Sequence, residues 1–158
     1  MNDLSPEQLR RHAETLELIN TEVTASLERQ FESGAQIDNK AIILVGYAAV
    51  ASSFLATRHA QPVLGGLAYA AYGMAAGFGI WAYAVRLYQD VPEPRRLFNS
   101  YLTHPKAQVL ATLAASRVEA FENNARKQSR KASRWWMSVL SLTIGLILMI
   151  LALNRTHF

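Results

Sequence analysis

The sequence predicts an all-α integral membrane protein with three transmembrane helices, an N-terminal cytoplasmic helix, and a long cytoplasmic helix continuous with the last span. Two observations predict this fold. Residues 41–57, 62–85 and 135–153 form runs of 17, 24 and 19 positions without Asp, Glu, Lys or Arg, and about 20 apolar residues cross a hydrocarbon core about 30 Å thick. These runs also lack the polar stripe of a soluble bundle helix, which disfavours a soluble fold with very apolar core helices.

The formal net charge of +4 is unevenly distributed along the chain. Residues 1–40 carry a net charge of −4, whereas residues 86–134 hold ten Lys and Arg and a net charge of +6. Arg58 and Arg155 are the basic residues outside these two segments. Because Lys- and Arg-rich segments stay in the cytoplasm, residues 86–134 and the N-terminus are predicted to be cytoplasmic, with the C-terminus outside.

Residues 1–36 are predicted to form a cytoplasmic amphipathic helix. Ser5 suits the N-cap and Pro6 the first helical position. Leu16, Val23 and other apolar residues recur at helical spacing, and Gly34 is expected to end the helix. An acidic helix with a narrow apolar stripe favours packing against another helix over lying on anionic lipid.

Residues 38–86 are predicted to form a transmembrane helical hairpin. Asp38 is expected to cap the first span, and Lys40 to extend its ammonium toward the headgroups. The segment 58–62 leaves room only for a short turn, so the two spans are antiparallel. The second span carries small residues at spacings of three and four, which favours close packing against the first span or against another subunit; they are Gly66, Ala70, Gly73 and Gly77.

Residues 87–134 are predicted to be a cytoplasmic loop and helix, followed by a third transmembrane helix over 135–154. Pro92 and Pro94 interrupt any helix, and a new one is expected to start near Pro105. No proline or glycine then occurs from Lys106 until Gly145, so one helix should enter the membrane, with the acidic N-terminal helix as a parallel or antiparallel partner. Basic and aromatic side chains are expected at the membrane interface; they are Arg130, Lys131, Arg134, Trp135 and Trp136.

Few residues in the sequence suggest transport, catalysis or metal binding. The three spans contain no Asp, Glu, Lys, Arg or His, which argues against a pump or a secondary transporter. The hydroxyls of Ser52, Ser53, Ser138, Ser141 and Thr143 are expected to bond to their own helices rather than line a pore. The chain has no cysteine, its four histidines are scattered, and no nucleophile stands beside a base, so neither an enzyme nor a metal site is expected, and no cofactor.

A basic cluster flanks the proline-containing break. Arg95, Arg96, His104 and Lys106 are cationic or polar groups in a predicted loop, and such groups can hold a phosphate. A nucleotide-binding site is one interpretation of this cluster, and a solvated basic loop is the other. No nucleic-acid partner is expected.

Asp38, Lys40 and Ala41 at the start of the first span, with Asn123, Asn124 and Lys131 before the last, give the chain a familiar pattern. It resembles the Pycsar transmembrane effector family of bacterial antiphage defence, and next the SLATT-type membrane effectors. The resemblance implies a homo-oligomer in the bacterial inner membrane that binds a cyclic pyrimidine mononucleotide, cCMP or cUMP. The membrane is then permeabilised in abortive infection. It also implies that either residues 86–134 or a partner senses the nucleotide.

Two other functions remain open from the sequence. A constitutive membrane anchor or scaffold would hold a soluble partner through its acidic and basic helices. A small ligand-independent pore would permeabilise the membrane on expression alone.

Overall fold

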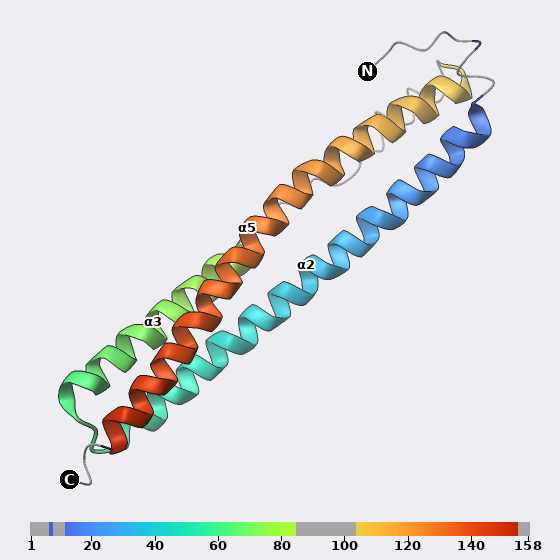
Figure 1. Cartoon of the computed structure of the whole chain (residues 1–158). Coiled ribbons are helices and arrows are strands. Elements are labelled where there is room, and N and C mark those ends of the chain that lie inside the picture. The colour runs from blue at the N-terminus through green and yellow to red at the C-terminus, as the bar shows by residue number, and fades with distance from the viewer. Residues whose placement is uncertain (1–6, 8–11, 85–103, 155–158) are drawn as a thin grey trace. The chain divides into compact units, whose positions relative to one another are not determined.

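The computed structural model describes residue 7 and residues 12–84 and 104–154. Three long helices account for almost all of them: α2 (Ala13–Ala56), α3 (Pro62–Ala84) and α5 (Lys106–Asn154) (Figure 1). No strand occurs in these ranges. The all-α prediction is therefore confirmed, and each of the three helices is long and apolar enough to cross a membrane.

The chain divides into two compact units, to which α2 and α5 both contribute. Unit 1 combines Met1–Ser33 with Leu87–Lys127, and unit 2 combines Gly34–Arg86 with Gln128–Phe158. The prediction of one continuous helix from Lys106 through the apolar residues 135–153 is confirmed, since α5 is unbroken over 49 residues.

The predicted helix end at Gly34 is wrong. α2 continues through Gly34 to Ala56, and no glycine in the described residues has a positive φ. The left-handed conformation that ends a helix at glycine is therefore not adopted. Asp38 lies inside the same helix, so it is not an N-cap either. The capping residues Ser5 and Pro6 lie outside the described residues.

In unit 1, α2 and α5 run parallel. Glu17 of α2 pairs with Lys106 of α5, and further along both helices the Gln30 amide donates to the Phe121 carbonyl at 3.3 Å. Leu27 on α2, with Val109 and Leu113 on α5, supplies buried apolar side chains. The structure thus decides between the two orientations that the sequence leaves open for these helices.

In unit 2, α3 returns antiparallel to both of its neighbours. A short turn follows α2, and the Gln61 side chain accepts a hydrogen bond from the Leu64 amide at 3.0 Å, which caps α3. Tyr72 of α3 contacts Met149 near the end of α5, whereas Trp81 contacts Arg134 nearer its middle. The antiparallel hairpin predicted for the first two spans is therefore present.

The interior of unit 2 consists mainly of small residues at coiled-coil spacing. On α3 the buried positions alternate in steps of three and four, and they include Gly65, Ala68, Tyr72, Ala75, Gly79 and Ala82. On α2, Ala41, Ala48 and Leu55 are buried seven residues apart. On α5, Lys131, Ser138, Gly145 and Ala152 continue the same seven-residue step. A repeat of 3.5 residues keeps one seam of each helix facing its neighbours.

The outer surface of unit 2 carries the large apolar side chains. Val50 is 67% exposed, Leu140 is 55% exposed and Ile147 is 53% exposed. A water-soluble bundle normally buries such residues and avoids large contiguous apolar patches. Small residues inside and large apolar residues outside suit a bilayer, where close helix contact rather than the hydrophobic effect drives packing. The described helices therefore support a membrane protein.

Candidate functional site

A buried ion pair joins α2 and α5 at one end of unit 2. The Nζ atom of Lys131 lies 2.6 Å from Oδ1 of Asp38. The Lys131 side chain is 1% exposed and the Asp38 side chain is 21% exposed. Both residues precede the charge-free stretches of their helices, so the pair lies where the polar part of each helix gives way to the apolar part.

Burying an ammonium is costly, because it loses its hydration. The penalty is still several kcal/mol per ion in real proteins, and attraction to a partner charge offsets it only when the geometry is good. Removing one partner typically costs about 3–5 kcal/mol, because the remaining charge stays buried. The pair therefore makes a strong coupling between α2 and α5 without contributing much net stability.

Two further cations surround this pair. Lys40 Nζ lies 5.9 Å from the centre of the Trp135 ring. The Arg134 guanidinium lies 4.2 Å from the centre of the Trp81 ring, and Arg134 also donates to the Trp81 carbonyl at 3.5 Å. Each cation–π contact contributes about 0.5–1 kcal/mol at exposed sites. We call this set the charged cluster: Asp38, Lys40, Trp81, Lys131, Arg134 and Trp135.

The residues predicted to lie at the membrane interface differ in their exposure and in their contacts. Arg130 is exposed, and Trp136 is 63% exposed and packs edge-on against Trp135 with ring centres 5.1 Å apart. Lys131 differs from them, because it is fully buried instead of extending into solvent. Sequence spacing did not indicate its pairing with Asp38, which lies 93 residues earlier in the chain.

Residues Asp38, Lys40 and Ala41, on which the resemblance depends, lie at this same place. Ala41 is fully buried one turn beyond Asp38, and its carbonyl oxygen would lie 3.4 Å from a Cβ added to Gly79. The motif thus lies where α2 approaches both other helices of unit 2 closely.

The predicted small-residue stripe lies on the outer face of α3. Gly66, Ala70, Gly73 and Gly77 are all exposed, and a Cβ added to any of the three glycines would meet nothing within 4 Å. Packing against the first span, one of the two expected partners, is therefore not seen among the described residues. Gly79 approaches its neighbours on the inner face instead, since an added Cβ there would lie 2.8 Å from Val45 Cγ2.

The predicted nucleotide cluster is only partly described. Arg95 and Arg96 lie outside the described residues, and His104 and Lys106 precede and begin α5. Lys106 is ion-paired with Glu17 of α2. A hydrogen bond from Lys106 to Glu17, together with the negative charge of that carboxylate, raises the pKa of Lys106. Its ammonium is thus engaged within unit 1, although its side chain stays 74% exposed.

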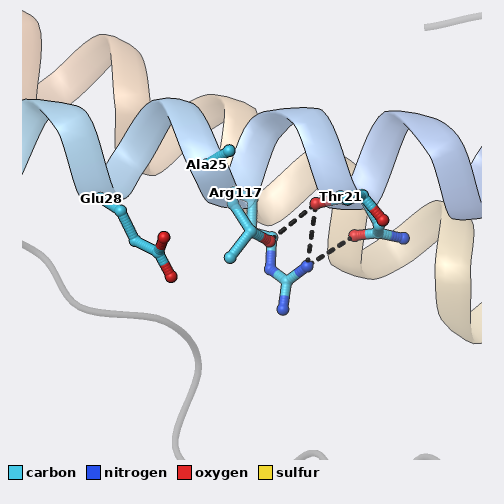
Figure 2. Close-up of a pocket in the computed structure, with 6 residues that line it drawn as sticks. Thr21, Ala25, Glu28 and Arg117 are labelled. Carbon is cyan, nitrogen blue, oxygen red and sulfur yellow. Dashed lines mark hydrogen bonds between the residues drawn. The ribbon is translucent and has the colours of Figure 1, made fainter.

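Unit 1 also contains a polar groove that the sequence did not indicate (Figure 2). The groove has a volume of about 350 Å³. Within it, Arg117 donates to Oδ1 of Asn20 at 3.0 Å, and Asn20 donates to the Leu110 carbonyl at 3.0 Å. Thr24 donates to the Asn20 carbonyl at 2.7 Å, and Glu28 also lines the groove. Hydrogen bonds to charged groups contribute about 1.5–3 kcal/mol, so Asn20 and Arg117 fix the contact of α2 with α5 here.

Most hydroxyls of the spans bond as predicted. Ser52, Ser53 and Thr143 each donate to the carbonyl four residues earlier, at 2.8, 3.0 and 2.9 Å. Ser138 differs from these three, because its hydroxyl donates to the Ala75 carbonyl of α3 at 2.7 Å and is fully buried. The prediction for Ser138 was therefore wrong, since this hydroxyl joins two helices.

In the described residues, no group of three or more His, Cys, Asp or Glu is placed to hold a metal ion. No protein-family model, curated protein or solved structure matches this chain. The function is therefore proposed from the residues and their arrangement.

Proposed function

We propose that this chain is a membrane effector that permeabilises the bacterial inner membrane when it is activated. Its spans are residues 41–57, 62–85 and 135–153, with the N-terminus in the cytoplasm and the C-terminus outside. The observation that carries this proposal is the packing of unit 2, with small residues inside and large apolar residues outside. Such a unit is stable in lipid, whereas in water it would expose most of its apolar bulk.

The activating ligand in this proposal is a cyclic pyrimidine mononucleotide, cCMP or cUMP, sensed by the cytoplasmic region. The resemblance to Pycsar effectors supports it, and so does the clustering of Asp38, Lys40 and Ala41 with Lys131. A ligand changes the state of a protein only by binding one arrangement more tightly than another. The membrane unit must therefore have a second arrangement, and the small-residue helix contacts make such rearrangement inexpensive.

The assembly in this proposal is a homo-oligomer. Three helices with a filled interior enclose no channel of their own, so permeabilisation requires several copies or a rearranged bundle. The outward stripe on α3 offers a surface for close helix contact; it consists of Gly66, Ala70, Gly73 and Gly77.

Dye release from reconstituted vesicles tests the proposal. The purified chain is placed in phosphatidylethanolamine and phosphatidylglycerol vesicles that hold a self-quenching dye, and cCMP, cUMP or cAMP is added. The expected result is release with cCMP or cUMP and none with cAMP. Release without any nucleotide would instead indicate a ligand-independent pore. A tight membrane under every nucleotide, with a stable soluble partner recovered from cells, would indicate a scaffold.

A further inference from the structure

The inward face of α5 in unit 2 begins with two buried polar groups. Lys131 is 1% exposed against Asp38, and Ser138, seven residues further on, is fully buried against the Ala75 carbonyl. Gly145 follows at the next seven-residue step and has no side chain. At these three positions α5 therefore offers polar and small groups to the interior, where Leu142 is a large buried apolar side chain, while Leu140 faces outward.

The negative charge of the Asp38 carboxylate stabilises the Lys131 ammonium in its buried, unhydrated position. Without that negative charge, the buried ammonium loses an attraction that offsets its lost hydration, so hydration becomes more favourable. Full hydration of the ammonium requires α2 and α5 to separate at this end of the unit. Asp38 is the more exposed member of the pair, at 21%, so solvent reaches the pair from its side.

We propose that the Asp38–Lys131 pair is a latch that closes the interior of unit 2 to water, and that its opening admits water as far as Ser138. The inference rests on the membrane placement in the proposed function and adds the contact at which that function is regulated. A pair that only sets the register of two helices would also be buried. Such a pair would lower stability when broken, but it would not control water entry into the folded unit.

A single thiol at position 138 tests this latch. The chain has no cysteine, so Ser138→Cys provides one near-isosteric probe inside the bundle. The full chain is reconstituted in phosphatidylethanolamine and phosphatidylglycerol vesicles, a charged membrane-impermeant methanethiosulfonate is added, and the rate of labelling is read by intact mass. The probe reacts only where water reaches the thiol.

The labelling rate is compared in four Ser138→Cys chains, the parent and three with further substitutions, to distinguish a latch from a purely structural ion pair. Asp38→Asn should raise the labelling rate at least ten-fold, because it leaves the ammonium without the carboxylate it faces. Asp38→Asn combined with Lys131→Met should return the rate to that of the parent, because no buried charge remains. Arg130→Met, the matched loss of an exposed cation one residue earlier, should leave the rate unchanged. Equal rates for Asp38→Asn and the parent, or a double variant as fast as Asp38→Asn, would overturn the latch.

Folding and function are read separately. Circular dichroism checks that each variant keeps its helicity. If Asp38→Asn does not reconstitute, Lys131→Met alone should label faster than the double variant, because it leaves the Asp38 carboxylate against a methyl group, and equal rates would overturn the latch. Fast labelling of Asp38→Asn without dye release under any nucleotide supports the latch and removes the permeabilising function. Nucleotide-triggered dye release with slow labelling of Asp38→Asn supports the permeabilising function and overturns the latch.

Discussion

Gly145→Ala is expected to destabilise unit 2, although alanine is the better helix former. A Cβ at position 145 would lie 2.6 Å from Cε1 and 2.7 Å from Cδ1 of Tyr72, and 3.3 Å from Cβ of Ala71. The Tyr72 ring is 1% exposed, and its hydroxyl lies 3.4 Å from the sulfur of Met149. The ring is therefore buried and its hydroxyl is in contact with Met149, so it cannot move away from the new methyl group without disturbing the core.

Two opposing effects determine how far Gly145→Ala changes the free energy of unfolding. Overpacking a tight interior costs about 1–3 kcal/mol, and contacts below 3 Å to a buried ring place this site in the upper half of that range. Replacing a mid-helix glycine by alanine returns about 0.5–1 kcal/mol. The expected net loss in the free energy of unfolding is about 1–2 kcal/mol.

Unfolding in mixed micelles measures this loss. The mole fraction of sodium dodecyl sulfate is raised against a mild detergent, helicity is followed by circular dichroism, and the free energy is extrapolated linearly. Gly46→Ala is the matched control on α2, because an added Cβ there meets nothing within 4 Å and Gly46 lies outside the proposed oligomer surface. It should be neutral or more stable by up to about 1 kcal/mol. A Gly145→Ala variant as stable as Gly46→Ala would refute the packing described here.

Three further outcomes are expected. Gly77→Leu should reduce the size of the detergent-solubilised assembly without lowering helicity, since Gly77 has open space around it in the described residues and lies on the proposed oligomer surface. An unchanged size in light scattering would reject this role. Asn20→Leu should destabilise unit 1 by about 1–3 kcal/mol, because it removes the acceptor of a charged hydrogen bond from Arg117, and hydrogen exchange should rise across α2 in unit 1 but not in unit 2. The Lys106–Glu17 contact raises the pKa of Lys106 above 10.5, so its contribution to stability is complete below pH 10.5 and is lost as pH rises through the higher folded-state pKa. Lys106→Met should therefore reduce the stability difference between pH 9 and pH 12, and a variant with the same difference as the parent would contradict the assignment.

The membrane helices were predictable because the signal is compositional. Long runs without charge mark the apolar parts of α2, α3 and α5 whatever their partners are. The helix end at Gly34 was misplaced for a physical reason. A glycine favours a helix end only when the left-handed conformation is used, and in α2 this residue is buried within a continuous helix.

The ion pair was not predictable from the charges alone. Asp38 suited a helix cap and Lys131 suited a headgroup contact, because each residue was read with its own sequence neighbours. The recurrence of Lys131, Ser138, Gly145 and Ala152 at seven-residue steps is a signal that could have placed Lys131 on the inner seam of its helix. Its partner on α2 depends on the parallel register of the two helices, which single-sequence patterns do not give.

The inner face of α3 was also ambiguous in the sequence. Small residues occupy both sides of this helix, so neither composition nor spacing selects the packed one. The structure buries the side that contains Ala75 and Gly79, and exposes the side that contains Gly73 and Gly77. Contacts from α2 and α5 make that choice, and they arise only in the folded unit.

Extraction of cell membranes tests the central claim most directly. Membranes from cells that express the full chain are washed with alkaline carbonate, which strips peripheral proteins, and then treated with a mild detergent. If α2, α3 and α5 cross the bilayer, the protein should stay in the carbonate pellet and enter solution only with detergent. Release by carbonate, followed by a monodisperse protein in plain buffer, would contradict it.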